Sequence, residues 1–392
     1  MGSKKDFLKY AHSMVDRRQE LMVDAGAFQE LKEKLLDDGV KRLYFISGKQ
    51  TKRLKLFDDF LNDLNASGIR CFQYSDVGSL PDARTVAYCA AECGTYNCEA
   101  IVAFGGGTVI DVAKMVSVWL TNPARSLYQM RGYGKIPNPG LDLYAVATTS
   151  SGSESSACAL LRHEKTVQMY YSENLIPKTV ILDPDLVLRL PVENMAAAAF
   201  FALTHAVEAY ISTFSGEFPP DRANILVAVP SFFSYLEKCY RHGVDSDMYI
   251  QMMMAPYYAG IASRRIGFGY AHCFAMRISE QYDVSPGKLC SAILPAILEF
   301  EFEETKVQLA ELARVAHLCS SRATVNEAAR ALIEGIRSLA RRVHLPDTVT
   351  VLRQEDLTSI VEKTLADARI WGCPRKLNAK LAIGFLKGIS TC

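Results

Sequence analysis

The sequence predicts an α/β N-terminal domain, built on a mostly parallel sheet, followed by an all-α C-terminal domain. Three observations support this fold class. Short apolar runs alternate with helical periodicity in the first half, a glycine-rich turn joins one such run to a helix, and the periodicity after Pro191 is almost wholly helical. The length of 392 residues is enough for about two domains.

The first half supplies strands and helices in alternation. The run 100–104 (AIVAF) is apolar throughout, as expected of a parallel strand that is covered on both faces. The segment 52–65 places apolar residues at helical spacing and ends before Gly68, which predicts a helix. By these criteria we expect strands at 42–47, 69–74, 100–104, 143–147 and 179–182, and helices at 52–65, 82–93 and 109–120.

The second half changes character near residue 188, between the dipeptides Asp183-Pro184 and Leu190-Pro191. We therefore expect an α/β domain over 1–188 and a helical domain over 189–392. Helical periodicity predicts helices at 193–214, 222–240, 247–263, 305–318, 325–343 and 357–366.

Composition excludes several classes of protein. With 44 basic and 43 acidic side chains, the chain has no electrostatic footprint for nucleic acid or for an anionic membrane. The most apolar stretch, 195–203, is too short to span a bilayer, and the N-terminus does not resemble a signal peptide. We expect a cytoplasmic protein.

The eleven cysteines do not form a zinc-ribbon pattern. They are scattered from Cys71 to Cys392, and Cys89, Cys93 and Cys98 come closest to the spacing of a ligand pair. We interpret most of them as small core residues in a reducing compartment.

A glycine-rich turn follows the strand predicted at 100–104. Gly105, Gly106 and Gly107 let the backbone approach a phosphate, and the start of the next helix supplies N–H groups and partial positive charge. Thr108 can cap that helix and donate to a phosphate oxygen. The turn is neither a GxGxxG fingerprint nor a P-loop. It indicates a phosphate site or, alternatively, a tight strand-to-helix turn without a ligand.

Several segments together resemble one family. Residues 105–114 (GGGTVIDVAK) resemble the GGGSxxDxAK signature of the iron-containing (group III) alcohol dehydrogenases, whose superfamily includes dehydroquinate synthase and glycerol dehydrogenase. Residues 146–154 (VATTSSGSE) are similar to the family's PTTAGTGSE loop, and 202–210 (ALTHAVEAY) to its DALTHAIEAY helix. Further matches at 177–191, 259–272 and 287–295 follow in the family's order, so the resemblance covers about residues 20–390. It implies the two-domain architecture expected above.

The resemblance implies a nicotinamide dinucleotide cofactor. In the family the glycine loop holds the pyrophosphate and the PTTAGTGSE loop flanks the nicotinamide. The implied cofactor-binding residues are Gly105, Gly106, Gly107, Thr108, Asp111, Thr148, Thr149 and Ser153. For Asp111 and Lys114 a helical i, i+3 ion pair is an adequate structural alternative.

NADP(H) is favoured over NAD(H). Relatives that prefer NAD carry an acidic residue at the end of the first strand, whereas here 47–53 (SGKQTKR) has no carboxylate and three cations. Gly48 and Lys49, together with Lys52, would tolerate and partly neutralise a 2′-phosphate. The alternative is that these lysines only solvate a helix start.

The resemblance fails at the metal site. The family binds its metal with an Asp and three His, and the Asp lies four residues before the first His. Here Phe201 stands at the Asp position and Pro286 at the third His position, so His205 and His272 alone are residual ligand positions. A further His of many relatives is Met276. Because two imidazoles are too few ligands, we expect no iron or zinc held in the family's manner. Glu208, Cys273, Glu280, Asp283 and Cys290 are the conceivable substitute ligands.

Arg265 suggests a substrate class. It stands seven residues before His272, where many relatives have Asn, and a guanidinium there can bind a carboxylate or phosphonate and orient a carbonyl. The alternative is an arginine on a solvated helix face.

These observations lead to three hypotheses. The first is an NAD(P)H-dependent reductase of a small, optionally anionic, aldehyde or ketone that works without the metal, with His205, His272 and Arg265 as catalytic residues in a cleft between the domains. The second is a catalytically silent relative that binds a nucleotide or assembles with a partner. A cyclisation like that of dehydroquinate synthase is the weakest. A homodimer is compatible with each.

Overall fold

The computed structural model describes residues 3–15, 19–49, 55–149, 151–164, 166–188, 191–241 and 245–390. The chain forms two compact units, 14–190 and 1–13 with 191–392. Residues 3–13 thus belong with the helices, although the sequence analysis assigns them to the α/β domain. The reason is Phe7 in α1 (Lys4–Ser13), whose fully buried ring packs edge-on against Trp371, with 4.8 Å between ring centroids.

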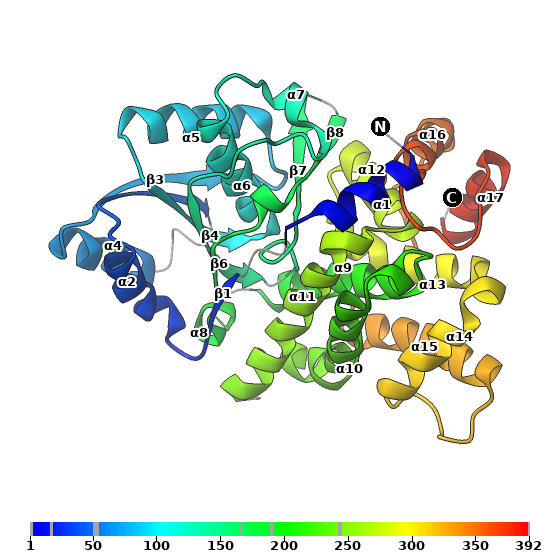
Figure 1. Ribbon diagram of the computed structural model, residues 1–392. Helices are drawn as coiled ribbons and strands as arrows, with labels where there is room; N and C mark the ends of the chain where they lie inside the picture. The colour runs from blue at the N-terminus through cyan, green and yellow to red at the C-terminus, as the bar shows by residue number, and fades with distance from the viewer. Residues whose placement is uncertain are drawn as a thin grey trace. The chain divides into compact units, whose positions relative to one another are not determined.

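The α/β unit contains a six-stranded parallel sheet, which confirms the predicted fold class (Figure 1). The strand order is β1-β9-β6-β4-β2-β3, and every neighbouring pair is parallel. The bounds are β1 Glu20–Val23, β2 Arg42–Gly48, β3 Arg70–Val77, β4 Ala100–Gly106, β6 Asp142–Thr149 and β9 Thr179–Leu182.

Helices cover both faces of this sheet. On one face, Phe28 of α2 and Phe57 of α4 pack with Phe45 and Phe104 of the strands. On the other face lie α5 and α6. The helices are α2 Ala27–Asp37, α4 Lys55–Ala66, α5 Ala83–Thr95, α6 Gly107–Thr121, α7 Leu127–Met130 and α8 Pro184–Val187. A second sheet, absent from the prediction, joins β5 (Gly132–Tyr133), β8 (Thr166–Tyr171) and β7 (Cys158–His163).

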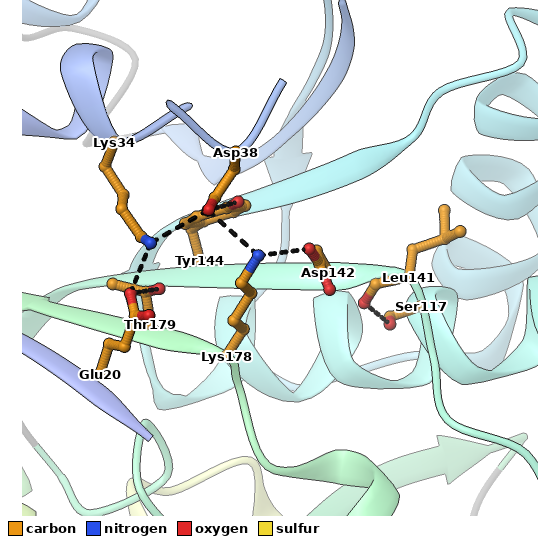
Figure 2. A network of polar contacts seen from close by, with 9 residues as sticks. All are labelled: Glu20, Lys34, Asp38, Ser117, Leu141, Asp142, Tyr144, Lys178 and Thr179. Carbon is orange, nitrogen blue, oxygen red and sulfur yellow. Dashed lines mark hydrogen bonds and ion pairs between the residues drawn. The ribbon is translucent and has the colours of Figure 1, made fainter. Parts of the chain in front are cut away.

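A network of charges fastens α2 to the amino ends of the strands, at the edge opposite the glycine turn (Figure 2). Lys178 Nζ lies 2.7 Å from Asp142 and 3.1 Å from Asp38, and Lys34 Nζ lies 2.7 Å from Glu20. The hydroxyl of Tyr144 donates to Asp38 as well. The glycine turn lies at the other, carboxyl edge of the sheet, between β4 and α6.

The second unit is helical, as predicted. Its longer helices are α9 Val192–Ile211, α10 Pro219–Arg241, α11 Ser246–Ile266, α12 Tyr270–Tyr282, α13 Pro286–Phe300, α14 Phe302–Val315, α15 Val325–Arg342, α16 Leu357–Ala368 and α17 Ala379–Ile389. The prediction omits α12, α13 and α17. Among the residues that the structure describes, no helix is long and apolar enough to cross a membrane.

Candidate functional site

The glycine turn joins β4 to α6 at the carboxyl edge of the sheet. β4 ends at Gly106, and α6 begins at Gly107 with Gly106 as its N-cap and no side chain bonded there among the described residues. The start of this fifteen-residue helix, whose N-cap residue has no side chain, is the kind of position at which N–H groups and partial positive charge bind an anion. Thr108 does not cap the helix as expected, because it lies inside the first turn and donates to the Ser79 carbonyl at 3.2 Å.

The glycines are required by the neighbouring loop. Gly106 pairs with Thr149 of β6, and a Cβ on Gly106 would overlap the Thr149 hydroxyl oxygen. A Cβ on Gly107 would lie 2.9 Å from the hydroxyl oxygen of Ser151. The structure thus places Gly106 and Gly107 beside Thr149, Ser151 and Ser153, with Thr148 buried and Thr149 half-buried.

Asp111 and Lys114 of α6 hold the second loop in place. Asp111 accepts a hydrogen bond from the Ser153 hydroxyl and another from the backbone N–H of Leu160, at 3.0 Å. Lys114 Nζ donates to the carbonyls of Ser156 and Cys158 at 2.9 and 2.8 Å. Burial raises the pKa of Asp111 to about 6, although the positive charge of Lys114 acts to lower it. In place of a simple i, i+3 ion pair, both side chains tie α6 to residues 153–160.

The end of β2 carries Gly48 and Lys49. The Lys49 ammonium lies 2.9 Å from Asp76, and both side chains are exposed. A carboxylate is therefore present near this position, supplied by β3 and not by the tract that follows β2. Ser47 is fully buried, and its hydroxyl has no hydrogen-bond partner among the described residues. Lys52 and Arg53 lie outside the described residues.

In the helical unit, His205 and His272 bond to each other. His205 Nε2 lies 2.8 Å from His272 Nδ1, and both residues are buried. Burial lowers the pKa of His205 to about 3 and that of His272 well below its usual value. Both imidazoles are therefore neutral at physiological pH. One N–H is shared between them, so the pair keeps one donor and one acceptor at its two outer nitrogens.

Aromatic rings surround this pair. Phe201 lies one turn before His205 on α9, and its ring centroid is 4.2 Å from that of His205 and 5.4 Å from that of His272. Phe268 stacks on His272 at 4.1 Å and 9°. The rings explain the loss of imidazole hydration, since they replace water with apolar carbon.

Glu208 is on the same face of α9, but it serves another helix. Its carboxylate accepts the N–H groups of Gly269, Ala271 and His272 at 3.0, 2.6 and 3.2 Å, at the N-terminus of α12. A Cβ on Gly269 would lie 2.5 Å from this carboxylate, so only glycine fits. Burial raises the pKa of Glu208 to about 7 against these three donors. Its oxygens are therefore committed to fixing the backbone that carries His272.

Pro286 begins α13, and its successor packs tightly on α9. A Cβ on Gly287 would overlap the carbonyl oxygen of Ala197, one turn before Phe201. Among the residues that the structure describes, no three His, Cys, Asp or Glu side chains form a group suited to a metal ion. Cys273 and Cys290 are buried in the core, and Glu280 lies 2.8 Å from Lys363 and also pairs with Arg277.

Arg265, near the end of α11, already has a carboxylate partner. Its Nε and Nη2 donate to the two oxygens of Asp221 at 2.7 and 3.2 Å, and the Asp221 side chain is only 4% exposed. The guanidinium also lies over the Phe218 ring, 5.4 Å from its centroid. This geometry gives no support to Arg265 as an anion clamp, because its charge and its paired donors serve the protein's own carboxylate.

The sequence analysis does not identify three features of this region: Asp221 as the partner of Arg265, the stacking of Phe268 on His272, and the capping of α12 by Glu208. The Asp221 and Glu208 contacts join residues that are far apart in the chain. Gly269 is the one residue that could have indicated the Glu208 cap, since a glycine immediately before a helix lets another side chain approach the backbone closely.

Two family profiles match the chain. Residues 19–184 match the profile described as "Iron-containing alcohol dehydrogenase", and residues 195–387 match "Fe-containing alcohol dehydrogenase family, C-terminal". The two matches together cover more than half of the chain.

Individual proteins similar to this chain include alcohol dehydrogenases. The chain is 25% identical over 327 residues to long-chain-alcohol dehydrogenase 1 of Geobacillus thermodenitrificans, covering 83% of this chain and 82% of the relative. It is 25% identical over 371 residues to NADPH-dependent butanol dehydrogenase of Clostridium saccharobutylicum, with 92% and 93% covered. The crystal structure of a 1,3-propanediol oxidoreductase has the same fold, with a TM-score of 0.89, 24% identity and coverage of 96% and 98%.

Proposed function

The chain belongs to the iron-containing alcohol dehydrogenase family of NAD(P)-dependent oxidoreductases, and on this premise we propose that it reduces a small aldehyde or ketone with NADPH and without the family's metal ion. Four parts of this proposal have separate support: the cofactor, its 2′-phosphate, the absence of a metal, and the group that polarises the carbonyl.

The glycine turn fits the pyrophosphate of a dinucleotide. The uncapped start of α6 supplies N–H donors and partial positive charge, and the missing side chains at Gly106 and Gly107 keep the approach open. Thr148, Thr149 and Ser153 would line the nicotinamide side, with Ser153 held by Asp111. The bound nicotinamide would supply a hydride to the carbonyl carbon.

Lys49 supports a preference for NADPH. Its ammonium can exchange Asp76 for a 2′-phosphate, since an ion pair between two exposed side chains is weak. Asp76 weakens the preference for NADPH, because its carboxylate competes with the 2′-phosphate for Lys49. The preference is kept because Gly48 and Lys49 themselves carry no negative charge.

The residues at the family's ligand positions do not fit a divalent ion. His205 and His272 each use one nitrogen on the other, and Phe201 places an aromatic ring where the relatives have a carboxylate. Glu208, the substitute on the same helix, is occupied by three backbone N–H groups. An ion bound by two imidazoles beside aromatic rings would be poorly solvated.

The histidine pair can take over one task of a metal. Hydride transfer turns the carbonyl oxygen into an alkoxide, which must be stabilised by hydrogen-bond donors. A neutral imidazole can donate to a developing oxyanion, and the pair retains one outer N–H in either tautomer. Because both pKa values are lowered, this donor stays neutral throughout the physiological range. Arg265 adds no support for an anionic substrate, so that class remains an alternative.

The surroundings of the same pair favour a second candidate function, that of a catalytically silent relative. If Phe201 and Phe268 block the outer nitrogens of the pair, the chain binds a nucleotide without turnover.

The reductase and the silent relative are distinguished by titrating the protein with NADPH and then following NADPH oxidation over a panel of small aldehydes and ketones. Binding with turnover supports the reductase, binding without turnover supports the silent relative, and no binding contradicts both.

The metal is tested by its stoichiometry. Protein purified without chelators should hold well under one equivalent of iron or zinc, and chelator should leave its melting temperature unchanged. The variant Phe201→Asp with Pro286→His restores four family-type ligand positions and should gain metal. A stoichiometric metal in the unmodified protein would contradict the proposal.

A further inference from the structure

The last turn of α5 brings two cysteines together. The backbone N–H of Cys98 donates to the Cys93 carbonyl at 3.0 Å, and that of Asn97 donates to the Gly94 carbonyl at 3.1 Å. Asn97 has φ of 50°, in the left-handed region. This is a Schellman ending, which characteristically places the side chains at the two ends of its longer bond in contact.

Here both of those side chains are thiols. Cys93 and Cys98 are free, buried thiols, with 1% and 8% of their surfaces exposed, and their side chains lie within hydrogen-bonding reach of each other. A disulfide requires Cα atoms about 4.4–6.8 Å apart, the separation that a turn closed by such a backbone bond provides.

A cation stands beside Cys98. Arg42 donates through Nε to the Asn97 carbonyl at 2.7 Å, and its guanidinium pairs with Glu99, on either side of Cys98 in the chain. The hydrogen bond from Cys93, and after it the charge of Arg42, lower the pKa of Cys98, while the same bond raises the pKa of Cys93. Cys98 is thus the more readily ionised thiol, and the Cys93 thiol lies next to it.

We propose that Cys93 and Cys98 form a redox-active dithiol that a peroxide oxidises to an intramolecular disulfide. This modification site is independent of the nucleotide turn, which lies at the opposite, carboxyl end of β4, and it does not rest on the proposed reductase activity.

The chemistry balances in two steps. The Cys98 thiolate attacks one oxygen of hydrogen peroxide, the O–O bond breaks, and hydroxide leaves and takes up a proton to become water. Cys98 is then a sulfenic acid. The sulfur of Cys93 attacks that of Cys98, the S–S bond forms, and the sulfenic oxygen departs as water with the proton of Cys93. Two thiols are oxidised and one peroxide is reduced to two waters.

The test is a peroxide titration of the full-length reduced protein, followed by alkylation and peptide mass spectrometry. Cleavage after Glu92 and Glu99 isolates 93–99 (CGTYNCE) from Cys89, and cleavage after Tyr96 leaves its halves joined only if the disulfide is present. We expect this peptide to oxidise at least about tenfold faster than Cys319, a partly exposed thiol in the other unit. Oxidation of Cys319 first, or a Cys89–Cys93 disulfide, would overturn the proposal.

Variants separate the two roles. Cys93→Ser should stop oxidation at a Cys98 sulfenic acid that dimedone captures, whereas Cys98→Ser should leave Cys93 unreactive. Cys89→Ser is the matched control, because Cys89 lies one turn earlier on α5 and burial raises its pKa to about 12, and it should leave the disulfide yield unchanged. Equal oxidation of Cys93 with and without Cys98 would overturn the assignment.

Discussion

His205 Nε2 lies 2.8 Å from His272 Nδ1, so the two imidazoles that remain at the family's ligand positions are bonded to each other. They come from α9 and from the first turn of α12, and Glu208 fixes their spacing by capping α12 from α9. Phe201 is in contact with both rings. The arrangement is a neutral hydrogen-bonding pair in aromatic surroundings, and the pH dependence and the metal independence predicted for this protein both depend on it.

Gly106→Asp should abolish NADPH binding, with a loss of at least about a hundredfold in affinity. The new Cβ would overlap the Thr149 hydroxyl, and the carboxylate would repel the pyrophosphate at the start of α6. NADPH fluorescence titration measures the loss. Gly216→Asp is the control, because a Cβ there meets no atom within 4 Å, and it should bind normally. Unchanged affinity in Gly106→Asp, with melting behaviour intact, would remove the cofactor site from this turn.

Lys49→Ala should narrow the difference between the dissociation constants of NADPH and NADH, by about three- to tenfold, because one cation near the 2′-phosphate is lost. Asp76→Asn should widen the same difference, since Lys49 is then no longer shared with a carboxylate. Both effects should shrink at high salt. Opposite signs from the two variants support the assignment, and equal constants for the two cofactors in the unmodified protein would refute it.

Arg265→Met should lower the free energy of unfolding by about 2–4 kcal/mol, because the buried Asp221 carboxylate loses the guanidinium that donates to both of its oxygens. Asp221→Asn in the same background should recover part of this loss, since it removes that charge. Urea unfolding of the wild type and of these two variants measures both effects. If Arg265→Met instead kept full stability and only raised KM for anionic aldehydes, the arginine would be a substrate ligand after all.

Stability should fall more steeply below pH 6.5 in the wild type than in His205→Asn. The folded-state pKa of His205 is about 3, below the usual 6.5, so the unfolded chain takes up a proton that the native state refuses. The contribution is therefore complete above pH 6.5 and is lost as the pH falls toward 3, by up to about 1.4 kcal/mol per pH unit. Parallel pH profiles for the two proteins would show that His205 is not held neutral.

The parallel sheet could be predicted because its central strands are continuous apolar runs. β1 was not predictable in this way, since its four residues are partly exposed and pair only with β9 at the sheet edge. The placement of helix α1 could not be predicted from its own sequence either. Its sequence is an ordinary amphipathic segment, and only the distant rings of Phe214 and Trp371 decide which unit it joins.

The proximity of the glycine turn and the second loop follows from the order of the strands, which alternating apolar runs and helices make predictable. Gly106 and Gly107 lie beside Thr149 and Ser153 because β4 and β6 are neighbours. The partner of Arg265 was not predictable, since Asp221 lies 44 residues earlier on another helix. The hydrogen bond between His205 and His272 likewise depends on where the Glu208 cap places α12, which no local pattern reveals.

The most direct test of metal-independent reduction compares two preparations of one protein. NADPH oxidation is followed with an aldehyde substrate, first on protein stripped by a chelator and then on the same protein reloaded with Fe²⁺ or Zn²⁺. Because the His205–His272 pair requires no ion, we predict the same rate in both. A rate that arises only after reloading would contradict the account and would return a metal to the centre of the reaction.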